Sequence, residues 1–174
     1  MAAFVETILR DVAAQTLEPE TRAWAPGPLP FQPDSFFLGR TEGGGVTRDP
    51  FGRMLRRCRI ATEGVVSTHG GVQFEEVFTY DDGEVDVWRW AMQPGYDGRY
   101  VAAESKAGAG IEGDQEGEDY LIRFRRPIGR AAGVFAPRFE ARFTLLAPDL
   151  AFKRARISLF GAPLGGLTAF HRRV

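Results

Sequence analysis

Few residues in this chain can form cross-links or metal sites. Its 174 residues include one cysteine, Cys58, and two histidines, His69 and His171. A single cysteine excludes a disulfide within the chain, and the three residues lie too far apart in sequence to form a recognisable zinc motif. No Gly-x-Ser-x-Gly pattern marks a serine nucleophile. We therefore expect a chain that folds around its own core and needs no metal or other cofactor.

Long apolar runs are also lacking. The best candidate for a membrane segment, residues 4–17, contains Glu6, Arg10 and Asp11 and so cannot cross a bilayer. No basic segment precedes it, as a secretory signal would require, and no cysteine lies near it to carry a lipid. We expect a cytoplasmic protein without a membrane anchor.

Lysine is scarce, and basic charge is unevenly distributed. Arginine supplies 20 of the 22 basic residues, and the others are Lys106 and Lys153. Residues 1–119 hold 21 acidic and 11 basic residues, whereas residues 120–174 hold 2 and 11. If late strands pair with early ones, the two charges interleave on one surface. Alternatively, the arginine-rich last third forms a basic patch for an anionic partner. We prefer the first interpretation and expect no nucleic-acid partner.

The overall composition, 44% hydrophobic and 26% charged, is that of one globular domain. Within residues 1–24, an apolar stripe at helical spacing predicts an amphipathic helix. Residues 25–35 follow as a proline-rich connector, and the prolines within residues 25–33 exclude a helix or a central strand there. Residues 36–174 are expected to form the main domain.

Short strand-like runs separated by turn signals fill this main domain. The clearest turn is Tyr80-Asp81-Asp82-Gly83, because an Asp-Gly pair between two alternating runs marks a hairpin. Successive hairpins form an up-and-down meander, the simplest route to a closed barrel. We therefore predict an all-β, antiparallel barrel of about 8–10 strands. The expected strands are residues 36–47, 53–62, 71–80, 84–92, 98–105, 118–126, 137–146, 151–160 and 166–173.

Residues 107–119 form a glycine-rich, acidic patch between two of these strands. Gly108, Gly110 and Gly113 match a Gly-x-Gly-x-x-Gly spacing. No βαβ unit surrounds them, and the neighbouring acidic residues would repel a pyrophosphate, so we reject a dinucleotide site. We expect a mobile acidic loop, with a weak calcium site as the alternative.

Aromatic residues cluster on single faces of the predicted strands. Glu76 shares its face with Phe74 and Phe78. If this face lines the interior, Glu76 is either paired, for example with an arginine of a neighbouring strand, or available for chemistry. The aromatic side chains either fill the barrel or leave room for one small guest. Glu76 and Arg142 are expected to contact the polar part of the ligand from the interior. The candidate ligand-binding residues are Phe74, Glu76, Phe78, Tyr80, Trp88, Trp90, Tyr120, Phe124 and Arg142.

Three segments of the sequence resemble a known family. Residues 74–84 and Trp90 carry the pattern Glu-x-Phe-x-Tyr-Asp-Asp-Gly followed by a tryptophan, and residues 154–161 resemble the family's penultimate strand. Residues 36–58 match its glycine-rich opening at Gly39, Gly43, Gly45, Asp49, Phe51, Gly52 and Arg57. Over about residues 36–173, the chain thus resembles a bacterial family catalogued as domain of unknown function 3833. The resemblance implies a calycin-type, lipocalin-like barrel and no established activity.

The chain also departs from this family's pattern. Glu140-Ala141-Arg142 stands where members often have Asp-Asp-Trp, and Ser105-Lys106-Ala107-Gly108 stands in place of Asp-Val-Val-Gly. Members usually begin with a lipoprotein signal, which is not visible here, so membrane anchoring is not carried over.

The leading hypothesis is a barrel that binds a small apolar or amphipathic ligand. The alternative is a hydratase, isomerase or cyclase acting on a lipid-like or isoprenoid substrate with Glu76 or Asp82 as base, although nothing in the sequence requires catalysis. A third hypothesis is a non-catalytic module that binds an anionic partner through the arginine-rich last third. The fourth is haem binding through His171. A homodimer is left open.

Overall fold

The computed structural model describes residues 29–127 and 135–174. The helix predicted within residues 1–24 lies outside these ranges, as does the first part of the predicted connector. In the described part of the chain, no helix is long and apolar enough to cross a membrane.

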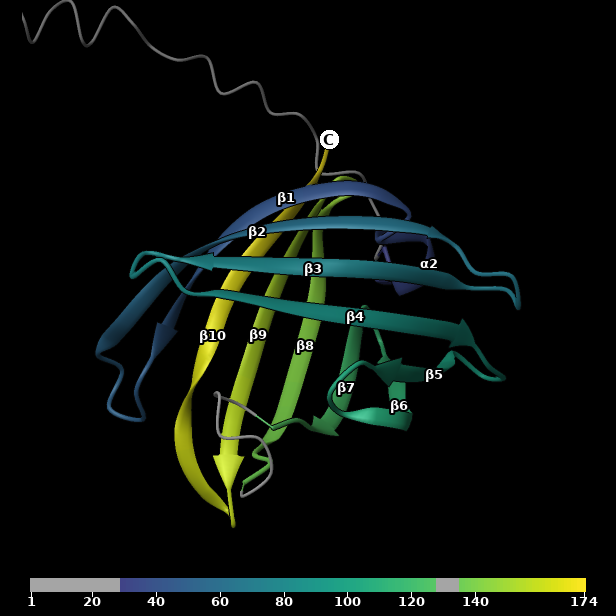
Figure 1. Ribbon diagram of the computed structural model, residues 1–174. Helices are drawn as coiled ribbons and strands as arrows, with labels where there is room; N and C mark the ends of the chain where they lie inside the picture. The colour runs from purple at the N-terminus through teal and green to yellow at the C-terminus, as the bar shows by residue number, and fades with distance from the viewer. Residues whose placement is uncertain (1–28, 128–134) are drawn as a thin grey trace, which may run out of the picture.

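Ten antiparallel strands form a closed barrel, which confirms the predicted fold (Figure 1). Each strand pairs with the next one in the sequence, and β10 closes the barrel by pairing with β1. A short helix, α2 (Pro33–Phe36), precedes them. The strands are β1 (Gly39–Arg48), β2 (Met54–Val66), β3 (Val72–Tyr80), β4 (Val85–Pro94), β5 (Arg99–Glu104), β6 (Gly108–Glu116), β7 (Asp119–Arg125), β8 (Arg138–Ala147), β9 (Leu150–Leu159) and β10 (Ala162–Arg173).

The predicted Asp-Gly hairpin joins β3 to β4. Gly83 has a φ of 84° and donates its N–H to the Tyr80 carbonyl. Glycine adopts this left-handed conformation without steric cost. Beyond the turn, Trp88 and Trp90 face the interior and the side chain of Arg89 faces solvent, as the alternation of the sequence predicts.

The glycine-rich acidic patch is a strand, so the predicted mobile loop is wrong. Strand β6 pairs with β5 and β7. At Gly113 a Cβ would collide with the Tyr120 hydroxyl, so the ring packs there only because the side chain is absent. Glu116 pairs with Arg142 at 2.9 Å. Glycine and acidic residues disfavour strands on propensity, but here ring packing and cross-strand ion pairs outweigh that preference. Among the described residues, no cluster suits a metal ion, so the calcium alternative has no support.

Helix α2 and its neighbours plug one end of the barrel, the closed end, where β1 begins and β10 finishes (Figure 1). The helix starts at Pro33, a position where the missing N–H of proline costs nothing. The expectation that residues 25–33 contain no helix is therefore wrong at Pro33. Phe31, Phe36 and Phe37 are buried here, and Phe37 stacks on Phe74 with ring centroids 4.4 Å apart.

Four of the nine described arginines in residues 120–174 pair with acidic residues: Arg123, Arg126, Arg142 and Arg172. Arg123 lies 3.3 Å from Glu140 and 3.5 Å from Glu116, and Arg142 lies 2.8 Å from Asp119. The two charges therefore interleave over part of the surface, as the first interpretation expects. In the ranges that the structure describes, three arginines of β8 and β9 lack an acidic partner within 4.0 Å: Arg138, Arg154 and Arg156.

Candidate functional site

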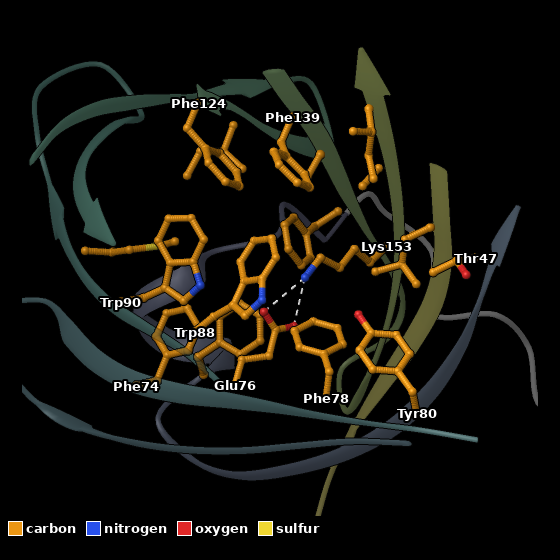
Figure 2. Close-up of a pocket in the computed structure, with 18 residues that line it drawn as sticks. Thr47, Phe74, Glu76, Phe78, Tyr80, Trp88, Trp90, Phe124, Phe139 and Lys153 are labelled. Carbon is orange, nitrogen blue, oxygen red and sulfur yellow. Dashed lines mark hydrogen bonds and ion pairs between the residues drawn. The ribbon is translucent and has the colours of Figure 1, made fainter. Parts of the chain in front are cut away.

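The barrel encloses a cavity of about 70 Å³. It lies between the closed end and the opposite end, the far end, where β1 finishes and β10 begins. One buried water needs roughly 10–15 Å³, so the cavity has room for about five waters. A cavity that holds a benzene ring measures about 150 Å³, so an aromatic guest requires the lining side chains to move. Its walls are mainly aromatic and aliphatic (Figure 2), and the aromatic lining residues are Phe37, Phe74, Phe78, Tyr80, Trp88, Trp90, Phe124, Phe139 and Phe143.

Two charged residues line the cavity and pair with each other. The Lys153 ammonium lies 2.8 Å from Oε1 and 3.1 Å from Oε2 of Glu76. Three strands separate β9, which carries Lys153, from β3, which carries Glu76, so the ion pair crosses the interior (Figure 2). Both residues are buried, at 6% and 2% exposure. Desolvating two charges is costly, and such a pair persists only when each charge is matched.

Aromatic rings surround the Lys153 ammonium on its remaining sides. Nζ lies 5.2 Å from the ring centroid of Phe143, 5.3 Å from that of Phe78 and 5.9 Å from that of Trp88. Rings at this distance attract a cation through their quadrupole. The ammonium is therefore held in one place in the cavity wall by one carboxylate and three rings.

His171 lies next to this ion pair, on the side of the closed end. Its Nε2 is 3.6 Å from Oε1 of Glu76, which is too far for a hydrogen bond. Complete burial, together with the nearby charge of Lys153, lowers the pKa of His171 well below its ordinary value, so the ring is neutral near pH 7. His171 packs against Phe37 and Phe143 and does not line the cavity. The cavity is also far too small for a haem, so the arrangement does not support the haem hypothesis.

Three buried polar side chains form a polar strip that continues from Glu76 across the wall. In the register of the sheet, Thr62 lies opposite Glu76 and Thr41 lies opposite Thr62. The Thr41 and Thr62 hydroxyls and both ring nitrogens of His171 lack a hydrogen-bond partner among the described residues. Buried polar atoms are rarely left unpaired, and none of these three residues lines the cavity.

A second buried cation, Arg126, lies in the wall near the far end. The Arg126 guanidinium donates to Asp86 at 3.0 and 3.1 Å, lies 3.2 Å from Glu104 and covers the Trp88 ring at 4.0 Å. Burial alone would raise the pKa of Asp86, but hydrogen bonds from Arg126 and Lys106 outweigh it and lower the pKa. This network fixes the Trp88 ring, one wall of the cavity.

Two further groups in the barrel can ionise but remain neutral. Burial raises the pKa of Tyr80 to about 12, and its ring lies 3.8 Å beneath the Arg56 guanidinium. Burial also raises the pKa of the Cys58 thiol. Thiolates are the reactive form of cysteine, so neither residue is activated for chemistry.

The structure brings most of the predicted site residues together. Tyr120 does not line the cavity, because it packs at the closed end against Phe31 and Tyr100. Arg142 does not enter the interior, so the prediction that it contacts a ligand there is wrong. Strand alternation turns Ala141 inward and Arg142 outward, where it donates a hydrogen bond to Asp119. The seven predicted residues that do line the cavity are Phe74, Glu76, Phe78, Tyr80, Trp88, Trp90 and Phe124.

Lys153 is the charged cavity residue that the sequence analysis missed. It stands in the run Ala151-Phe-Lys153-Arg-Ala155, where the neighbouring arginines suggest an exposed basic strand. The signal lay in the alternation, because Ala151, Lys153 and Ala155 share the buried face. The other predicted base, Asp82, lies on the exposed β3–β4 turn and pairs with Arg56 at 3.1 Å.

Solved structures share this fold at low sequence identity. An S-type phycobiliprotein lyase, CPES, from Guillardia theta aligns with a TM-score of 0.60 and 11% identity, over 81% of this chain and 92% of that one. A protein of unknown function from the DUF3598 family of Nostoc punctiforme aligns with a TM-score of 0.57 and 13% identity, over 86% of this chain. This chain spans 53% of that second protein. At such identities the likeness shows the fold alone.

Comparison with curated protein sequences gives no match. Comparison with protein families does give a match. It extends from residue 17, before the described part of the chain, to residue 173 at the end of β10. Because this match spans nearly the whole sequence, the chain belongs to the DUF3833 family of proteins of unknown function.

Proposed function

We propose that this chain binds a small apolar or amphipathic molecule in the barrel cavity. One observation carries the proposal: an enclosed, aromatic-walled space whose two charged lining residues, Glu76 and Lys153, neutralise each other. Small-molecule sites combine mostly apolar walls with a few placed polar groups. The ion pair would contact the polar end of the ligand, and Phe78, Trp88 and Phe139 would contact its apolar body.

The size and position of the cavity restrict the ligand. The space is about half that of a cavity known to hold benzene, so a ring must displace lining side chains. A longer ligand would extend toward the far end past Tyr80, Ile157 and Leu167, which are only partly buried. The likeness to a phycobiliprotein lyase supports this proposal through the fold only.

Native mass spectrometry of the freshly purified protein, compared with its denatured mass, tests the proposal. A mass excess that disappears on denaturation identifies a captured guest. In parallel, fatty acids, isoprenoid alcohols and benzyl alcohol are titrated while tryptophan emission is recorded. A Trp24→Phe background leaves Trp88 and Trp90 as the only emitters. We expect a saturable change with at least one class; no mass excess and no response to the whole panel would contradict the proposal.

A second candidate function rests on the outer wall. Arg48, Arg138, Arg154 and Arg156 line a groove formed by β1, β8, β9 and β10. Arginine favours bidentate contacts with anions, so we propose an anionic partner as the alternative. Retention on heparin that falls steeply with salt, and that is lost in Arg154→Gln/Arg156→Gln, would support it. Retention that ignores salt would contradict it.

A further inference from the structure

The cation in the cavity is a lysine in a chain built almost entirely with arginine. Of the two lysines, Lys106 is half-exposed and pairs with Asp86, whereas Lys153 is buried in the cavity wall. The other buried cation, Arg126, carries a guanidinium. Arginine suits a purely structural buried ion pair better, because its planar group donates several fixed hydrogen bonds. An amine differs in one chemical respect: it can lose a proton and act as a nucleophile.

The surroundings of Lys153 suit that chemistry. Its Nζ faces the cavity and hydrogen-bonds the carboxylate of Glu76 alone, at 2.8 and 3.1 Å. A carboxylate at this distance can accept a proton directly. Both groups are shielded from bulk water, and low water activity favours a reaction that releases water.

We infer that Lys153 forms an imine with an aldehyde held in the cavity. This inference rests on the proposed function and specifies its ligand class: an aldehyde whose body is a single aromatic ring or a comparably small flat group. The rings of Phe78, Trp88 and Phe139 give the cavity flat apolar walls. Lys153 and Glu76, which already pair with each other, are the two charged groups that line it.

The reaction balances without an oxidant or a reductant. Glu76 accepts a proton from the Lys153 ammonium, and the free amine attacks the carbonyl carbon. A C–N bond forms, and the attacking nitrogen passes one of its protons to the carbonyl oxygen to give a neutral carbinolamine, while Glu76 stays protonated. Protonated Glu76 then donates to the hydroxyl, which leaves as water while the nitrogen lone pair forms the C=N bond. One ammonium and one aldehyde become one protonated imine and one water, and the Glu76 carboxylate remains as its counter-ion.

The test uses the whole chain with benzaldehyde and sodium cyanoborohydride near pH 7. The hydride traps an imine as a benzylamine, and peptide mapping locates it. Two lysines in the sequence make the assignment simple. We expect Lys153 to be labelled about tenfold faster than Lys106, and Glu76→Gln to remove most of that advantage. Because Glu76→Gln can also disturb folding, the unfolded wild-type chain in urea serves as a second control, in which both lysines should react alike.

Binding of benzyl alcohol, which cannot form an imine, separates the two proposals. If benzyl alcohol binds in the cavity but Lys106 reacts as fast as Lys153, the imine inference is overturned and the proposed function stands. If neither benzyl alcohol nor benzaldehyde enters the barrel, both fail. Lys153→Arg provides the control for the labelled position: it keeps the charge but has no amine, so the label at position 153 should disappear while Lys106 is still labelled.

Discussion

Lys153 on β9 and Glu76 on β3 meet inside the barrel at 2.8 Å, although 76 residues lie between them in the sequence. Phe31 and Tyr120 pack toward the closed end. The cavity extends along β3 on both sides of Glu76, from Phe74 to Tyr80. The pair therefore ties two distant parts of the wall together and forms the charged part of the cavity lining.

Removing one member of the pair should destabilise the fold strongly. Lys153→Met leaves the Glu76 carboxylate buried without its partner, which should cost about 3–5 kcal/mol of unfolding free energy. The double variant Lys153→Met/Glu76→Leu removes both charges and should recover most of this loss. Urea unfolding of the wild type, both single variants and the double variant measures the coupling. Additive losses in the double variant would contradict a direct buried pair.

The unfolding free energy should fall as the pH is lowered below about 6.5, before the carboxylates titrate. An unfolded histidine has a pKa near 6.5, and the pKa of folded His171 lies well below that, with Glu76 and Lys153 as its charged neighbours. Below about pH 6.5 the unfolded chain therefore binds more protons, so unfolding free energy drops by at most about 1.4 kcal/mol per pH unit. The pKa values of Asp86 and Asp119 are lowered from 3.8, so their contribution is lost only at more acidic pH.

Unfolding measured between pH 7 and pH 5 tests this account of His171. His171→Leu should abolish the drop in that window, and His69→Gln, in an exposed turn, should retain it. An unchanged pH profile in His171→Leu would contradict the assignment of the drop to this residue.

The two arginine networks should differ sharply in their effect on stability. Arg126 is fully buried and pairs with Asp86 and the buried Glu104, so Arg126→Met should cost about 3–5 kcal/mol. Arg142 forms its ion pairs on the half-exposed outer wall, so Arg142→Gln should cost less than about 1 kcal/mol. Thermal and urea unfolding compare the two. Equal losses would mean that the burial of Arg126 has no energetic consequence.

Two adjacent glycines of β1 provide a matched pair for the packing of the barrel wall. A Cβ at Gly43 would collide with the Phe170 carbonyl oxygen, whereas at Gly44 it would stay 3.3 Å from the Cys58 carbonyl oxygen. Gly43→Ala should therefore cost about 1–3 kcal/mol through overpacking, and Gly44→Ala should change stability by less than about 1 kcal/mol. Guanidinium unfolding measures the loss of stability in each variant. A larger loss in Gly44→Ala than in Gly43→Ala would contradict the described register of β1.

Local sequence signals were enough to predict the barrel. The Asp82-Gly83 turn and the alternation through Trp88 and Trp90 depend on neighbours within a few residues, and both predictions are confirmed. Strand β6 was missed because its stability comes from Tyr120 over Gly113 and from arginines on adjacent strands. These partners are not part of the local pattern.

The candidate site was predicted only in part for the same reason. The aromatic lining follows from alternation within each strand, and most of it was identified. The partner of Glu76 depends on how the barrel closes, which brings β9 near β3. Arginine was the expected partner, but Arg142 lies on the outward face of its strand and Lys153 on the inward face of the next.

Ligand binding to a barrel with its cavity filled tests the central claim most directly. Ala141 lines the cavity, and Ala141→Leu adds three carbons there. In a Trp24→Phe background, benzyl alcohol should change Trp88 and Trp90 emission saturably in the parent and in Arg142→Gln, where the altered side chain lies outside the barrel. The same titration should give no response in Ala141→Leu with the fold intact by circular dichroism. An equal response in Ala141→Leu, or a response lost in Arg142→Gln, would contradict binding in the cavity.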